Sequence, residues 1–127
     1  MAQTERVVPP PPGQVEPVQD NSNPVYTYVE QMPEYPGGNE AMMAFLRKNL
    51  RYPETAKETG VEGRVIVRFV VNEDGTISDI TILRDIGAGC GAEAVHVVKM
   101  MPKWKPGKQN GKAVKTYFNL PVMFRLN

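Results

Sequence analysis

Residues 114–126 read VKTYFNLPVMFRL, the most regular alternation in the chain. Even-numbered positions hold Val, Thr, Phe, Leu, Val, Phe and Leu, whereas odd-numbered positions hold Lys, Tyr, Asn, Pro, Met and Arg. A period of two places successive side chains on opposite faces of a strand. The run therefore predicts a strand with one buried face.

Pro121 lies inside this run, although proline has no N–H for a sheet ladder and is normally restricted to edges or bulges. We therefore expect the last strand to be a sheet edge with Pro121 facing outward, or a bulge at Pro121 if that register is wrong. Backbone groups alternate sides, so residues of its parity should also turn outward, while even-numbered residues bond inward. The outward residues, which are the candidate partner-binding ladder, are Lys115, Tyr117 and Asn119.

A second strand pair is predicted upstream. Residues 63–71, GRVIVRFVV, hold Val and Phe at one parity and mix arginine with Ile and Val at the other, which indicates a strand with one wet face. Residues 72–75, NEDG, supply a hairpin turn, and β-favouring residues resume from Thr76 to Arg84. The alternation slips between Ile77 and Ile80, which suggests a bulge.

Three helices are expected around these strands. Asn39 can cap the first, and a second, residues 54–59, can end at a left-handed Gly60. A third follows a glycine-rich stretch and stops before Pro102. The expected buried positions on the first and third helices are Met42, Phe45, Leu46, Leu50, Ala94, Val95, Val98 and Met101.

The connection from the second strand to the last is too long for a hairpin and carries a helix, so a right-handed crossover is expected. Such a crossover skips one strand. We therefore predict an α+β fold with a three-stranded antiparallel sheet of order 2-1-3 and the helices packed on one face.

Composition divides the chain near residue 37. Eight of the 12 prolines fall within residues 1–36, and residues 1–37 carry one base against five acids, whereas the remainder has a net charge of +5. We therefore predict a proline-rich flexible linker over residues 1–36 that does not pack on the domain, and one domain over residues 37–127. No run approaches the roughly 18 to 20 apolar residues that cross a bilayer.

Catalytic and cofactor chemistry find little support. Residues 87–92, GAGCGA, fit a dinucleotide-binding turn, but the acid expected about 20 residues later is absent, because Glu93 is the last acid. Cys90 and His96 are each the only residue of their type, and their spacing places them on different helix faces. The sequence also lacks a dense cluster of metal ligands. We expect no enzyme, no cofactor and no metal.

A lysine-rich run covers the end of the third helix and the following loop: Lys99, Lys103, Lys105, Lys108, Lys112 and Lys115. A solvated surface and attraction of an acidic peptide both fit it. Nucleic acid is not expected as a partner, because no nucleic-acid motif is present and the charge is modest. Trp104, between a helix stop and a Pro-Gly turn, is interpreted as a packing anchor.

Several spaced motifs resemble the TonB C-terminal domain family over roughly residues 49–127. In order they are Tyr52-Pro53-x-x-Ala56, Gly60-x-x-Gly63-x-Val65, Phe69-x-Val71-x-x-x-Gly75, Trp104-x-Pro106-Gly107-Lys108 and Leu120-Pro121-Val122-x-Phe124.

This resemblance implies a periplasmic domain anchored to the inner membrane by an N-terminal helix that this chain lacks, and driven there by a proton-channel complex. It also implies that an added strand, the TonB box of outer-membrane TonB-dependent transporters, binds the sheet edge. Tyr52 and Pro53 match the family's receptor-contacting segment, while residues 49–51 do not. A TonB-like interaction domain within a membrane sensor or peptidase-associated protein is the alternative, and a homodimer is possible.

Overall fold

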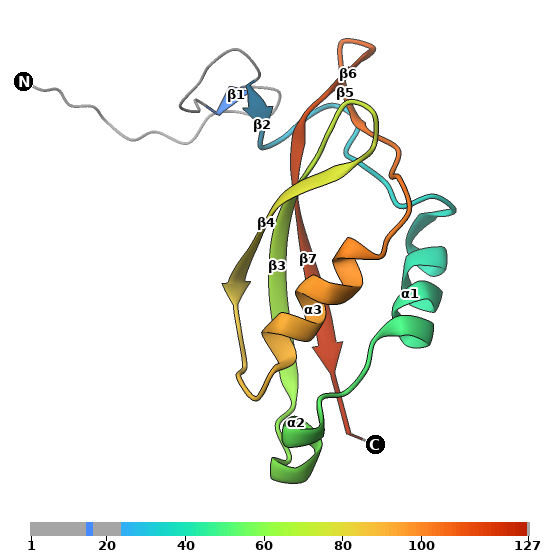
Figure 1. Cartoon of the computed structure of the whole chain (residues 1–127). Coiled ribbons are helices and arrows are strands. Elements are labelled where there is room, and N and C mark those ends of the chain that lie inside the picture. Colours follow the sequence, from blue (N-terminus) through green and yellow to red (C-terminus); the bar gives the residue numbers. More distant parts are fainter. Residues whose placement is uncertain (1–14, 17–23, 127) are drawn as a thin grey trace, which may run out of the picture.

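The computed structural model describes residues 15–16 and 24–126 (Figure 1). Its helices are α1 (Gly38–Asn49), α2 (Glu54–Thr59) and α3 (Cys90–Lys99). Its strands are β1 (Val15–Glu16), β2 (Val25–Tyr26), β3 (Gly63–Val71), β4 (Ile77–Arg84), β5 (Gly107–Gln109), β6 (Lys112–Val114) and β7 (Thr116–Phe124).

The three long strands form the centre of the main sheet. β3 pairs with β4 and with β7, both antiparallel, so the expected 2-1-3 order and the α+β class are confirmed for these strands. The β3–β7 register runs unbroken from Val71↔Thr116 to Gly63↔Phe124. Pro121 pairs with Ile66 within this unbroken register, which excludes a bulge at the proline.

The expectation of a three-stranded, purely antiparallel sheet is wrong at its outer side. The sheet has the order β1-β2-β7-β3-β4, and β2 pairs with β7 in parallel at Tyr26↔Thr116. The last strand is therefore not an edge along its whole length. Two-residue strands such as β1 and β2 are too short to show a hydrophobic period, which is why the sequence did not reveal them.

Residues 24–36, which we name the N-terminal strap, pack on the domain. Val25, Val29 and Tyr35 are buried, and the strap bridges the backbone at Gln31↔Lys108 and Glu34↔Lys105. The expectation that residues 1–36 do not pack on the domain is therefore wrong for the strap. Residues 15–16 also pair with the strap, as β1 with β2. Residues 1–14 and 17–23 lie outside the described residues, so the linker stays a prediction there.

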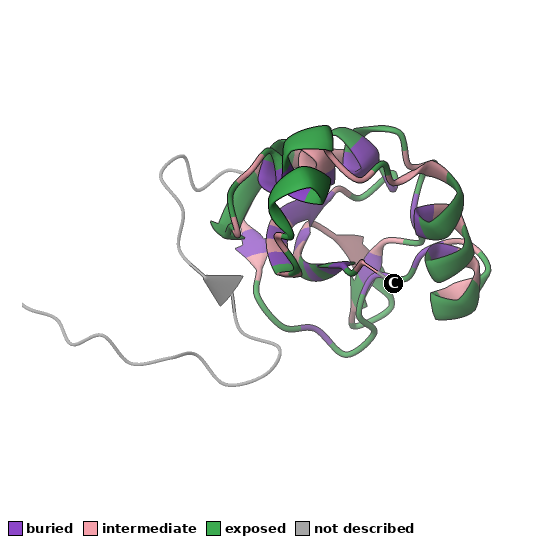
Figure 2. Ribbon diagram, turned by 90° about the horizontal axis from the view of Figure 1, so that it is seen from below, coloured by how far each residue is buried: buried purple, intermediate pink, exposed green. Residues whose placement is uncertain are grey.

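The core lies between one face of the sheet and the three helices. Val65, Val67, Phe69 and Val71 of β3 point into it and are fully buried, as the alternation predicts. Figure 2 shows the buried stretches of helices and strands turned toward this interior, with exposed stretches outside. Within the described residues, none of the helices is long and apolar enough to span a bilayer.

The helices and turns follow the predictions with local corrections. Gly37, not Asn39, is the residue before α1, and Val97 rather than Val95 is buried on α3. The β4 bulge is confirmed, because the register shifts opposite Arg68 to Val70 and Asp79 there has a φ of 52°. The lysine-rich loop contains an unpredicted hairpin, β5–β6, whose Asn110-Gly111 turn has positive φ at both residues.

Trp104 joins the β3–β4 turn to the core. Its backbone N–H donates to the Gly75 carbonyl over 2.9 Å, and its buried ring packs edge-on against Phe69, Phe118 and Tyr35. The indole N–H has no hydrogen-bond partner among the described residues, so packing holds the ring in place. The sequence-based interpretation of a packing anchor is confirmed.

Gly75→Ala should be far more destabilising than a glycine substitution in open space. Gly75 has a φ of 90°, and an added Cβ would lie 2.2 Å from the Trp104 carbonyl oxygen. We expect a loss of about 2–4 kcal/mol in the free energy of unfolding, measured by urea denaturation. Gly111→Ala is the control, because φ is 76° with no atom within 4 Å, and should cost about 1–2 kcal/mol. Equal losses would contradict the role of the Trp104 contact.

Candidate partner-binding edge

The outer side of β7 carries the candidate ladder. The Lys115 carbonyl accepts a hydrogen bond from the Tyr26 N–H over 2.8 Å, so the backbone groups of Lys115 face away from β3. Because backbone groups alternate sides along a strand, Tyr117, Asn119, Pro121 and Met123 face the same way. This orientation agrees with an unbroken ladder in which Pro121 has no N–H to offer β3.

The strap covers only the beginning of this ladder. Its strand β2 pairs with β7 at Thr116, and among the described residues no strand pairs with the outer side of β7 beyond that region. Asn119, Pro121 and Met123 are exposed. Of the three predicted ladder residues, Lys115 is thus already engaged, Tyr117 lies next to the covered position, and Asn119 begins the open stretch.

The face of the sheet opposite the helices carries arginines. Arg64 and Arg68 of β3 lie on it, because their neighbours in sequence point into the core, and Arg84 of β4 pairs with Ile66 on the same face. The Arg68 guanidinium carbon lies 4.3 Å from the centre of the Tyr117 ring, a cation–π contact. No ion pair joins these arginines to an acid within residues 24–126. This face therefore adds positive charge beside the open edge.

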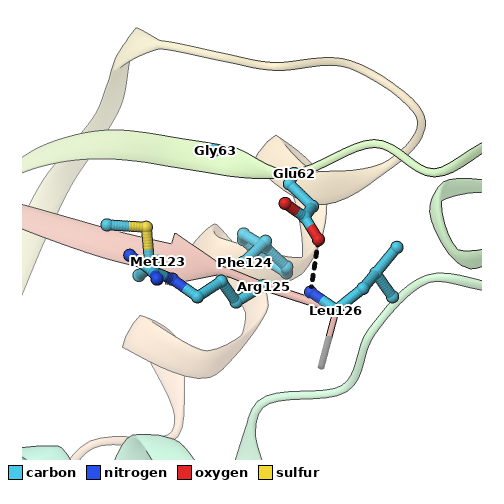
Figure 3. A pocket seen from close by; sticks show the side chains of 6 residues that line it. All are labelled: Glu62, Gly63, Met123, Phe124, Arg125 and Leu126. Carbon is cyan, nitrogen blue, oxygen red and sulfur yellow. Dashed lines mark hydrogen bonds between the residues drawn. The ribbon is translucent and has the colours of Figure 1, made fainter.

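A hollow of about 430 Å³ lies where β7 ends (Figure 3). Met123, Arg125 and Leu126 line it on one side and Glu62 and Gly63 on the other. The Glu62 carboxylate accepts the N–H of Leu126 over 3.0 Å, which holds the end of the chain against the start of β3.

Tyr52 and Pro53 hold the fold together at the same end of the core, next to Phe124. The Tyr52 hydroxyl donates to the Val61 carbonyl, and its ring packs edge-on against Phe124 at 5.6 Å. Desolvation, with smaller contributions from Glu62 and Cys90, raises the pKa of the Tyr52 hydroxyl. Pro53 lies close to Gly89, since a Cβ added there would meet the proline ring at 3.4 Å. Contact of these two residues with a partner stays a prediction.

The lysine-rich run divides between two surroundings. The backbone of Lys105 and Lys108 pairs with the strap at Glu34 and Gln31, whereas Lys108 and Lys112 lie exposed on the β5–β6 hairpin. Glu30 of the strap joins this hairpin, because its N–H donates to the Gln109 side chain and its carboxylate accepts the Asn110 N–H. The backbone of this run thus pairs with the strap, while the side chains of Lys108 and Lys112 contribute exposed positive charge.

The Asp85 side chain occupies the glycine-rich turn before α3. The Asp85 carboxylate accepts the Gly87 N–H over 2.9 Å, and its oxygen lies 2.3 Å from the position of a Cβ on Gly91. A carboxylate therefore occupies the place that a nucleotide phosphate would need at a helix N-terminus.

Cys90 and His96 do not form a reactive pair. Cys90 is fully buried, and desolvation together with Asp85 raises the pKa of its thiol, which disfavours the nucleophilic thiolate. His96 is exposed. Among the described residues, no group of three or more His, Cys, Asp and Glu side chains could hold a metal ion.

Sequence reasoning missed the strap and its effect on the ladder. The signal available was weak: Val25 and Val29 are two apolar residues four apart in a segment with a proline-rich, acidic composition. The Asn110-Gly111 dipeptide in the lysine-rich loop, by contrast, is a recognisable hairpin-turn signal.

Comparison with known protein families identifies proteins that are similar to this chain. The family model for the Gram-negative bacterial TonB protein C-terminal region matches residues 48–126. Protein TonB of Pseudomonas aeruginosa is 37% identical over 77 residues, covering 59% of this chain and 22% of that protein. Protein TonB of Helicobacter pylori is 43% identical over 50 residues, covering 36% of this chain and 18% of that protein. The chain thus spans about a fifth of these curated relatives.

Solved structures show the same fold. An NMR structure of a Helicobacter pylori TonB C-terminal domain superposes with a TM-score of 0.52 at 22% identity, covering 68% of this chain and 90% of that one. A longer form of that domain gives a TM-score of 0.50 at 25% identity, covering 68% and 77%.

Proline substitutions in β7 should show different losses of stability for N–H groups that face β3 and for those that face outward. Phe118→Pro removes an N–H that faces Phe69 of β3 and should cost about 3 kcal/mol or more of unfolding free energy. Asn119→Pro removes an outward N–H at an exposed position and should cost much less. Chemical denaturation of both variants measures the difference. A larger loss for Asn119→Pro would show that the inferred parity is reversed.

Proposed function

The chain belongs to the TonB C-terminal family, and on that premise we propose that it binds extended N-terminal peptides of outer-membrane TonB-dependent transporters by adding their strand to β7. In this proposal the domain works in the periplasm and transmits energy from the inner membrane to nutrient uptake. Its partners are the TonB box of a transporter and, through an N-terminal helix outside this chain, a proton-channel complex.

The observation that carries the proposal is the open outer ladder of β7. Asn119, Pro121 and Met123 are exposed and face away from β3, and no described strand covers them. An extended peptide can bond to the N–H groups of Asn119 and Met123 and to the carbonyls of all three residues. Such main-chain hydrogen bonds can form with peptides of many sequences. Selectivity among peptides therefore depends on side chains and on the surrounding charge.

Side chains beside the ladder supply that selectivity. A strand added to β7 places alternate side chains about 4.5–5.5 Å from Tyr117, Asn119, Pro121 and Met123 on the helix-free face. Arg68 and Arg125 lie near the two ends of this row, and the hollow below Met123 lies at its end. A peptide with acidic groups near apolar ones fits this row best.

The function requires force rather than chemistry. A peptide bonded along the edge of a sheet resists a pull through several backbone hydrogen bonds, and the domain needs no reactive group to transmit that pull. The proline-rich leader suits a spacer, because polyproline segments extend about 3.1 Å per residue. Cys90, His96 and the filled turn at Asp85 are then structural residues.

Peptide titration tests the proposal. Transporter N-terminal peptides added to the labelled chain should shift the amide signals of β7 from Tyr117 to Met123. Asn119→Pro should abolish these shifts, because it removes an outward donor, while Asn119→Ala keeps the N–H and should bind as the parent does. Dilution separates binding from pairing of two copies at the same edge. Shifts confined to residues far from β7 would overturn the proposal.

Affinity for an acidic peptide should fall as salt rises. Lys108, Lys112 and the arginines of the free face are exposed or half-buried and form no ion pair within the described residues. Their attraction for an acidic peptide is therefore screened beyond about 10 Å at 0.1 M ionic strength. Isothermal titration across a range of salt concentrations measures the effect. A dissociation constant that is unchanged from low to high salt would rule out an electrostatic contribution from these residues.

A further inference from the structure

The strap occupies part of the surface on which the proposed partner binds. Its Tyr26 N–H donates to the Lys115 carbonyl over 2.8 Å, at the first outward position of the ladder. One side of a strand accepts a single neighbouring strand, so a partner peptide and β2 cannot both occupy this position. With the strap in place, a peptide reaches the ladder only from Asn119 onward.

Two buried valines help to hold the first half of the strap, together with the pairing of β2 with β7 and with β1. Val25 is 8% exposed and Val29 is 7% exposed, and the nearest Val29 methyl lies 3.2 Å from the position of a Cβ on Gly107. Neither valine belongs to the main core cluster, whereas Tyr35, further along the strap, does. The first half of the strap, residues 24–29, can therefore leave while Tyr35 stays packed on Trp104.

A hinge for such a movement lies at the following residues. Glu30, Gln31 and Glu34 bond to the β5–β6 hairpin and the segment before it through both backbone and side chain. These bonds anchor the second half of the strap independently of β7. Local opening of a segment with few buried side chains is much easier than global unfolding.

We propose that the first half of the strap, residues 24–29, is removable and blocks the start of the partner-binding ladder. The partner's own extended segment displaces it. This inference rests on the proposed function, because it names a competitor for the same site. Displacement frees Lys115 and Tyr117, so the ladder grows from three outward residues to five. The surface beneath is suited to an extended segment with small apolar side chains four residues apart, as Val25 and Val29 are.

The apparent affinity for the partner peptide is proportional to the fraction of molecules in which the strap is open. When the competent state is a minor one, populated to about 10% or less, affinity falls tenfold or more relative to a chain whose strap is open. Releasing the strap should therefore tighten peptide binding by at least about tenfold.

The test uses a variant of the whole 127-residue chain that releases the strap, Val25→Asp with Val29→Asp. The control, Tyr28→Asp with Met32→Asp, adds the same two charges to the strap at exposed positions, since these side chains are 53% and 39% exposed. Hydrogen exchange should show lost protection at Tyr26 in the release variant alone, with β3 unchanged. Titration with a transporter peptide should then give the tighter binding only in the release variant.

Equal affinities for release and control variants, with the strap open by hydrogen exchange, would overturn the inference. Absence of binding to any variant would instead overturn the proposed function.

A second arm needs no transporter peptide. A synthetic peptide of residues 24–36, added in trans, should shift the Lys115 and Gly107 amides of the release variant and leave the control variant unchanged. If that peptide does not bind the release variant, the surface beneath the strap is not a peptide-binding surface, whatever the transporter peptide does.

Discussion

The contact between Trp104 and Gly75 ties together elements that are far apart in the sequence. The Trp104 N–H bonds to the Gly75 carbonyl, and the Trp104 carbonyl oxygen lies where any side chain on residue 75 would begin. This contact fixes the β3–β4 turn to the chain that leaves α3. Because the Trp104 ring also packs on Phe69, Phe118 and Tyr35, one residue joins turn, sheet and strap. Where β7 starts follows from where this residue is held.

The glycines of the family motifs are structural for the same reason. Gly107 follows Trp104 by three residues, and a Cβ there would lie 2.4 Å from the Thr116 hydroxyl oxygen and 3.2 Å from a Val29 methyl. The chain can therefore pass between β7 and the strap only without a side chain. Motif residues that first resemble a binding signature thus position the edge, while the edge itself is made of backbone groups.

The proposed binding and the proposed blocking are two uses of one ladder. β7 is central at its first residues, where β2 covers it, and open from Asn119 onward. An exposed strand edge invites unwanted pairing, and a short covering strand is one way to limit it. In the proposed function, the strap lies between the proline-rich leader and the domain, so a pulling force would arrive at the same edge that holds the partner.

The sequence pattern was enough to predict the central sheet and its parity. Alternation in residues 63–71 and 114–126 predicted which side chains are buried, because each strand meets the core with a period of two. Pro121 predicted the outward parity of β7, because a missing N–H leaves only one side available for it. The order of the family motifs indicated the fold from residue 49 onward.

Tertiary structure alone decided how much of the edge is free and which surroundings the motif residues have. Tyr26 pairs with β7, and Val29 packs beside Gly107, across some 80 residues of chain. Contacts over such separations leave no periodic trace in a segment this short. Tyr52 likewise could be read as a partner contact, yet its hydroxyl bonds to Val61 within the domain. The alternation of residues in a strand predicts on which side of the strand each residue lies. Only the folded chain decides which other segment already covers that side.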